Sequence, residues 1–196
     1  MNSSDLKKAK RDVRRRVLAL REELPPEERA RLATRAAARF LALPQVGSAG
    51  TVMAFWAFGS EMPTMPLIEA LIARGATVAL PRIVDGELQA RTWRPGEPMA
   101  ATAFGAMEPE AGMVLAAHEI DVIATPAVAF DRDGRRVGYG GGFYDRFFPR
   151  ARRDALRVGI GFGMQVVEGE LPAGAFDLRV EFLVTESETV RCRIDP

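Results

Sequence analysis

The chain begins with two segments in which alanine and leucine recur at helical spacing among charged residues. Ser3-Ser4-Asp5 can cap a first helix that runs to about Glu23, and Pro25-Pro26-Glu27-Glu28 can start a second that Pro44 ends. We therefore expect two N-terminal helices over about residues 4–43.

Beyond residue 50 the pattern changes to short apolar runs separated by turn residues. Thr51–Phe58 predicts a strand, Pro66–Arg74 a short helix and Thr77–Ile83 a second strand, which form one strand-helix-strand unit. Asp85-Gly86 is typical of a tight hairpin and predicts that Leu88–Trp93 returns antiparallel. The remaining expected elements are an irregular stretch through Gly112, a strand at Asp121–Thr125, a glycine-rich loop at Phe130–Gly142, a helix at about Phe143–Arg150, and strands at Arg157–Phe162 and Phe182–Thr185.

These elements predict a single α/β domain over residues 1–196, with its α/β core at about residues 50–190. Strands that alternate with helices favour a mixed, mainly parallel sheet flanked by helices. The sequence contains no internal repeat, low-complexity tract or linker long enough to separate two domains.

Composition narrows the class of protein further. Of the 196 residues, 47% are apolar, which is typical of a soluble domain that can bury a core. The longest apolar run, Val52–Phe58, is far shorter than the roughly 20 residues of a membrane-spanning helix, and Met1–Lys10 carries no apolar signal segment. We expect a cytoplasmic protein without a membrane segment. The single cysteine, Cys192, and the single histidine, His118, exclude a disulfide framework and a cysteine or histidine metal cage, and we interpret both as structural.

Charge is unevenly distributed along the chain. The first forty residues hold 12 basic and 6 acidic groups, against 15 and 20 in the remainder. A basic N-terminus can bind RNA, but no aromatic stacking set accompanies it, and its spacing favours a solvated helix face. We therefore expect no nucleic-acid partner.

The segment richest in candidate chemistry follows Phe130. Gly138, Gly140, Gly141 and Gly142 fall within five positions, and a glycine loop before a helix can bring backbone N–H groups close to a phosphate. The same cluster is equally typical of a tight surface turn. No lysine occurs after Lys10, which excludes a Walker A loop, and the spacing does not fit a dinucleotide fingerprint.

An acidic residue enters the first turn of the helix after this loop. Asp145 can hold a metal bound to phosphates, or it can simply complement the helix dipole. Serine-nucleophile and zinc-protease motifs are missing, so we predict no catalytic nucleophile. Phosphoryl transfer from ATP with magnesium fits best, because that chemistry needs placement and charge stabilisation more than a reactive side chain.

The string from Arg136 to Asp145 strongly resembles the Arg-Leu-Gly-Tyr-Gly-Gly-Gly-Tyr-Tyr-Asp signature of the 5-formyltetrahydrofolate cyclo-ligase family, also called 5,10-methenyltetrahydrofolate synthetase. Other blocks agree in order along the chain: Lys10-Arg11-Asp12-Val13-Arg14, Gly59-Ser60-Glu61-Met62-Pro63-Thr64, Leu80-Pro81-Arg82 and Phe104-Gly105-Ala106-Met107-Glu108-Pro109. The resemblance covers about Lys10 to Glu186.

The resemblance implies a three-layer α/β fold and an ATP- and magnesium-dependent conversion of 5-formyltetrahydrofolate to 5,10-methenyltetrahydrofolate. ADP and phosphate are released, through a phosphorylated formyl intermediate. The implied substrates are 5-formyltetrahydrofolate and ATP. We expect the protein to be a monomer. The alternatives are a relative that binds nucleotide or folate without turnover and, less favoured, an RNA-binding protein.

Roles carry over residue by residue from the resemblance. Lys10, Arg14, Arg136, Gly138, Tyr139, Gly140, Gly141, Gly142 and Tyr144 match the ATP site; Trp56, Glu61, Tyr139 and Phe143 the folate site; and Asp145 and Asp177 the magnesium ligands. Trp56 is equally compatible with a place in the core, and Asp177 with a cap at a strand. Two positions depart from the family pattern: Phe143 replaces the first tyrosine of the signature, and Phe176 stands where many members have histidine.

Overall fold

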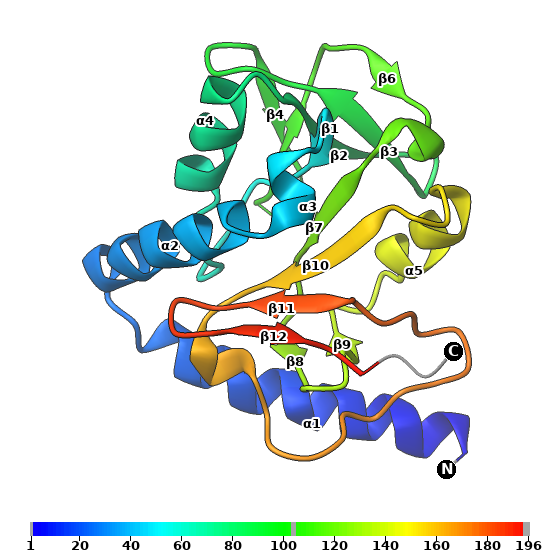
Figure 1. The fold of residues 1–196 in the computed structure, drawn as a ribbon. Coiled ribbons are helices and arrows are strands. Elements are labelled where there is room, and N and C mark those ends of the chain that lie inside the picture. The colour runs from blue at the N-terminus through cyan, green and yellow to red at the C-terminus, as the bar shows by residue number, and fades with distance from the viewer. Residues whose placement is uncertain (1, 103–104, 194–196) are drawn as a thin grey trace.

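A mixed sheet of eight strands forms the centre of the protein (Figure 1). The structure is a computed structural model, and it describes residues 2–102 and 105–193. Phe104, which belongs to one of the matched sequence blocks, lies outside the described residues. The sheet order is β12-β11-β10-β7-β1-β2-β3-β6. These strands span β1 (Thr51–Met53), β2 (Thr77–Val84), β3 (Glu87–Thr92), β6 (Val114–Leu115), β7 (Val122–Thr125), β10 (Leu156–Ile160), β11 (Phe182–Val184) and β12 (Thr189–Arg191).

The five central strands from β11 to β2 run parallel, and the two edges are antiparallel. In register, Val52 lies between Val78 of β2 and Val122 of β7. The predicted mixed, mainly parallel sheet is therefore confirmed. None of the helices in the described part of the chain has the length and apolar character needed to cross a membrane.

The helices are α1 (Ser3–Glu22), α2 (Pro26–Leu41), α3 (Pro44–Gly47), α4 (Met65–Ala73) and α5 (Phe143–Phe147), with single 3₁₀ turns η1 (Ala117–Glu119), η2 (Phe148–Arg150) and η3 (Gly163–Gln165). The two predicted N-terminal helices are confirmed, but the predicted cap is wrong. Asn2 caps α1, and its side-chain oxygen accepts a hydrogen bond of 2.8 Å from the Asp5 backbone N–H. Ser3 and Ser4 are already inside the helix.

Alternation along the central strands divides the core into two faces. Val52 and Val122 belong to the cluster that α2 and α4 cover, whereas Met53 and Ile123 belong to the cluster that α5 covers. Figure 1 shows α2 and α4 on one side of the sheet and α5 on the other. The protein therefore has the three layers of a helix-sheet-helix arrangement.

The hairpin between β2 and β3 forms as predicted. Asp85 has a φ of 51° and Gly86 a φ of 79°, so both central residues adopt the left-handed region that this two-residue turn demands. The strand expected at Thr51–Phe58 is shorter than predicted. It ends at Met53 because the chain then leaves the sheet, after one more backbone bond of 2.9 Å from Ala54 N–H to Ala79 C=O.

Two segments predicted as irregular contain short hairpins. The stretch before Gly112 includes β4 (Met99–Ala101) paired with β5 (Met107–Pro109). The glycine-rich loop includes β8 (Ala129–Phe130) paired with β9 (Arg136–Val137), folded around the buried carboxylate of Asp131. These strands are too short to show an alternating pattern, so sequence periodicity misses them.

Candidate active site

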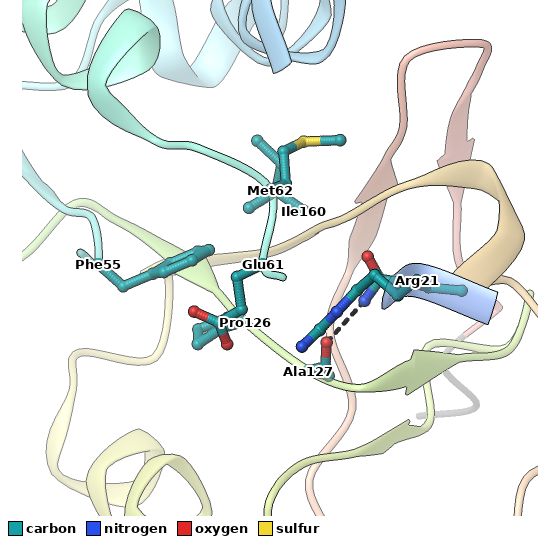
Figure 2. Close-up of a pocket in the computed structure, with 8 residues that line it drawn as sticks. Arg21, Phe55, Glu61, Met62, Pro126, Ala127 and Ile160 are labelled. Atoms are coloured by element: carbon teal, nitrogen blue, oxygen red, sulfur yellow. Dashed lines mark hydrogen bonds between the residues drawn. The ribbon is translucent and has the colours of Figure 1, made fainter. Parts of the chain in front are cut away.

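The candidate site lies where the strand order of the sheet reverses. From β1 the chain passes through α4 to β2 on one side, and from β7 it passes through α5 to β10 on the other. Open α/β sheets bind ligands beyond the carboxyl ends of the strands at such a switch point. Glu61 follows β1, Pro126 and Ala127 follow β7, and all three line one small pocket with Arg21 (Figure 2).

Glu61 is the buried acid of this pocket. Its side chain is only 6% exposed, and its Oε2 accepts a hydrogen bond of 3.1 Å from the Phe58 backbone N–H. Burial raises the pKa of Glu61 to about 7, while the Phe58 N–H and the Arg21 charge act in the opposite direction. A carboxylate poised near neutral pH in a cleft is a candidate for ligand binding or proton transfer.

Arg21 is a buried cation that sequence reasoning missed. It is 2% exposed, its Nε donates to Ser60 Oγ at 3.0 Å, and its Nη2 donates to Tyr139 Oη at 2.6 Å. Figure 2 shows its side chain reaching from α1 toward Glu61. A signal was available, because Arg21 follows Arg14 by two helical turns and so shares its face.

The glycine loop between β9 and α5 has steric reasons for its glycines. Gly140 and Gly142 have φ values of 111° and 65°, which disfavour other residues. A Cβ atom on Gly141 would stand 2.5 Å from the Phe143 ring. Arg14 Nε donates to the Gly138 carbonyl at 2.6 Å, which fixes the loop to α1.

A second side chain that sequence reasoning missed braces the loop from its other side. Arg146 Nη1 donates to the Gly141 carbonyl at 2.9 Å, and its Nη2 donates to the Gly86 carbonyl at 2.9 Å. Its guanidinium also lies over the Phe143 ring, 5.2 Å from the centroid. The glycine loop is therefore held between α1 and the β2–β3 hairpin.

Asp145 sits beside the loop in an ion pair with Arg136. Arg136 Nη2 donates to Asp145 Oδ1 at 2.7 Å, and the Leu178 backbone N–H donates to the same oxygen at 3.0 Å. The Arg136 guanidinium is almost fully buried over the rings of Tyr144 and Phe148. This burial lowers the pKa of Arg136, and Asp145 opposes the change.

The other predicted carboxylate is paired with the N-terminal helix. Lys10 Nζ donates to Asp177 Oδ2, and the Gly174 backbone N–H donates to the same oxygen at 2.6 Å. The charges of Asp145 and Asp177 both raise the pKa of Arg136, so both carboxylates lie near this cation. The structure thus brings Lys10, Arg14, Arg136, the glycine loop and both aspartates together.

The donor set fits a magnesium ion that also takes phosphate oxygens. In the described part of the chain, every hydrogen bond to Asp145 uses Oδ1 and every one to Asp177 uses Oδ2, so one oxygen of each carboxylate remains for a ligand. Three or more metal-binding side chains do not gather anywhere among residues 2–102 and 105–193. Magnesium suits such a sparse set, since it is held by one or two carboxylates together with phosphates.

Two predicted folate residues take separate places. Trp56 packs edge-on against Trp93 at 5.5 Å between centroids and lines a groove of about 350 Å³ together with Glu61 and Arg29. Phe143 packs instead against the glycine loop and Arg146. The groove therefore joins Trp56 to Glu61, whereas Phe143 lies beside the glycine loop.

The two signature tyrosines differ in exposure. Tyr139 is 44% exposed, its ring lies 5.0 Å from that of Phe58, and partial burial raises its pKa to about 12. The hydroxyl of Tyr144 is buried without a hydrogen-bond partner among the described residues, and burial raises its pKa. The ring of Tyr144 lies beside Arg136 and Phe148.

Comparison with known proteins identifies the family. The model of the 5-formyltetrahydrofolate cyclo-ligase family matches residues 6–186. The chain belongs to the 5-formyltetrahydrofolate cyclo-ligase family. The resemblance seen in the sequence is confirmed, and so is the prediction of an enzyme of this family.

Individual cyclo-ligases match over most of their length. The 5-formyltetrahydrofolate cyclo-ligase of Escherichia coli is 35% identical over 174 residues, which cover 86% of this chain and 95% of the relative. The Mycolicibacterium smegmatis cyclo-ligase is 34% identical over 70% of this chain and 74% of its own. The solved Aquifex aeolicus 5,10-methenyltetrahydrofolate synthetase superposes with a TM-score of 0.82 at 33% identity, covering 95% of this chain and 94% of that one.

Proposed function

We propose that this chain is an ATP- and magnesium-dependent ligase that converts 5-formyltetrahydrofolate to 5,10-methenyltetrahydrofolate and releases ADP and phosphate. The observation that carries the proposal is that Arg14 binds the glycine loop, while Lys10 pairs with Asp177 and Arg136 with Asp145. This arrangement supplies fixed positive charge and two carboxylates at one place, as phosphoryl transfer requires.

Different residues of this chain bind the phosphates, hold magnesium and orient Asp145. Lys10 and Arg14 bind phosphate oxygens from one face of α1, and the glycines let the backbone approach them closely. Asp145 and Asp177 hold magnesium, which neutralises phosphate charge when bound. Arg136 keeps Asp145 oriented through its ion pair of 2.7 Å.

The folate is received at the Glu61 pocket and the adjoining groove. An ionised Glu61 accepts hydrogen bonds from the donor edge of the pterin. Trp56 and the apolar wall of the groove exclude water from the ring. Because the Glu61 pocket and the glycine loop meet at Tyr139, the formyl group and the phosphates approach each other there.

The reaction needs alignment rather than a nucleophilic side chain. The formyl oxygen bonds to the γ-phosphorus of ATP while the bond from that phosphorus to ADP breaks. The neighbouring amine nitrogen of the folate then bonds to the formyl carbon and loses its proton. The carbon–oxygen bond breaks last, so phosphate leaves carrying the formyl oxygen.

Absorbance of the methenyl product tests the activity directly. We expect a signal only with 5-formyltetrahydrofolate, ATP and magnesium together. Lys10→Met should raise the KM for ATP at least about tenfold, because it removes a charge-assisted contact to phosphate. Lys8→Met is the matched control, since Lys8 is exposed two residues away on the same helix.

A heavy-oxygen label on the formyl group tests the intermediate separately. Transfer of the label into the released phosphate is expected. Label that appears in water contradicts a phosphorylated formyl group. Folate and ATP binding with no product at all would instead identify a binding protein without turnover.

A further inference from the structure

Arg21 joins two segments that lie 39 and 118 positions away from it in the sequence. One guanidinium donates to Ser60 Oγ, in the loop that carries Glu61, and to Tyr139 Oη, in the glycine loop. Its third nitrogen, Nη1, is buried and has no hydrogen-bond partner among the described residues. The side chain lines the small pocket that Glu61 also lines.

The surroundings of Glu61 explain why a cation is needed there. Apolar walls from Phe55, Met62 and Ile160 enclose the pocket and disfavour an ionised carboxyl. The titratable and charged groups that face Glu61 are Arg21 from α1, Arg29 from α2 across the groove, Tyr139 from the glycine loop and Tyr144 from α5.

These groups differ in what they do to the carboxylate. Arg29 is only partly buried and donates to the Gly59 carbonyl at 3.1 Å, whereas the two tyrosines carry no positive charge. Arg21 is the cation that lowers the pKa of Glu61. Its charge is desolvated together with the carboxylate, so their attraction is little screened by water.

We propose that Arg21 is a positioning residue that keeps Glu61 charged and holds Tyr139 beside it, so that the folate pocket is ready only when the glycine loop is docked. The inference rests on the proposed function in one respect, which is that Glu61 receives the folate. The guanidinium suits this task because its planar fork can donate hydrogen bonds to Ser60 and Tyr139 at once. A lysine at the same place carries the charge but cannot hold both hydroxyls in that geometry.

Carboxyl carbon NMR on protein with labelled glutamate tests the charge role without any substrate. Arg21→Met should raise the titration midpoint of Glu61 by about one pH unit or more, because a nearby opposite charge is lost. Arg21→Lys should restore most of the midpoint. Arg16→Met, which removes an exposed cation from the same helix, should leave it unchanged. An unshifted midpoint in Arg21→Met overturns the inference.

Kinetics separates positioning from a merely structural role. In Arg21→Met we expect the KM for 5-formyltetrahydrofolate to rise about tenfold near neutral pH and to recover as pH increases. Arg21→Lys should keep the wild-type pH profile with a higher KM at every pH. A uniform loss of kcat in both variants contradicts the inference.

The two proposals fail in different ways. A shifted Glu61 midpoint in a protein that makes no methenyltetrahydrofolate upholds the Arg21–Glu61 coupling and removes the proposed reaction. Normal turnover with an unchanged Glu61 midpoint upholds the proposed reaction and overturns the Arg21–Glu61 coupling. If neither Arg21 variant folds, Arg21 serves folding alone and the positioning role is overturned.

Discussion

The buried surroundings of Glu61 disfavour its ionised form at neutral pH. Burial raises its pKa to about 7, and a buried carboxyl without a full ion pair costs stability when it is charged. A glutamine at this position would avoid that cost. The charge is therefore explained by ligand binding rather than by folding.

Glu61→Gln should stabilise the protein above neutral pH. The pKa of Glu61 is raised from 4.5 to about 7, so the protonated form favours the folded state. This contribution is fully present below about pH 4.5 and is lost as pH rises to about 7. Urea unfolding between about pH 4 and 8 should show the wild type losing on the order of 3 kcal/mol relative to the variant. Parallel pH profiles of the two proteins would refute this.

Asp145→Asn should lower kcat/KM by about 100-fold or more, because it removes the carboxylate that we propose holds magnesium and that pairs with Arg136. Activity titrated with magnesium should also require a higher concentration. Asp133→Asn is the control, since Asp133 is a partly exposed carboxylate that pairs with Arg135. Equal activity of the two variants would exclude Asp145 from the site.

At the scale of elements, local patterns predicted most of what forms the body of the sheet. β2, its hairpin turn and α4 fall within one or two residues of their predicted bounds, because alternation, Asp-Gly and proline are local signals. β6 and β12 were missed. Both are short edge strands, and their pairing depends on neighbours distant in sequence.

The candidate site was predictable where a motif repeats a family pattern. The glycine loop, Lys10 and the two aspartates were found in this way, and the structure brings them together. Arg21 and Arg146 were not found because arginine is common in this chain and each makes contacts with residues 39 or more positions away. The helix face that Arg21 shares with Arg14 is a local signal, but the distant contacts themselves leave no local pattern.

Gly141→Ala tests the close packing of the glycine loop. The added methyl group would stand 2.5 Å from the Phe143 ring, so the loop or the ring must shift. We expect the KM for ATP to rise about tenfold while the free energy of unfolding changes by less than about 1 kcal/mol. Gly47→Ala, at a helical glycine with open space around it, should change neither. An unaltered KM for ATP in Gly141→Ala would show that the loop does not cradle the nucleotide.

For the molecule as a whole, α1 acts as a brace across separate parts of the chain. Its inward face carries Lys10, Arg14, Val17 and Arg21, and Val17 packs into a cluster with Val128 and Val137 of the β8–β9 region. In Figure 1 this helix runs below the β8–β9 hairpin. The sites that we propose for nucleotide and for folate therefore both include residues of this helix.

Amide hydrogen exchange along α1 tests whether this helix supports the proposed nucleotide site. ATP with magnesium is expected to slow amide exchange along α1, because ligand that binds only the docked helix stabilises it. α2 is the internal reference, since its contacts are with α3, α4 and β11. Lys10→Met should abolish the added protection of α1, whereas Lys8→Met should preserve it. Protection that spreads equally over α1 and α2 would contradict a local brace.

The contacts of α1 with residues far along the chain can form only late in synthesis. Lys10 pairs with a residue 167 positions later, and Arg14 and Arg21 contact residues 124 and 118 positions later. α1 leaves the ribosome long before these partners and is thus among the last helices to find them. The candidate site can therefore close only after Asp177 has been synthesised.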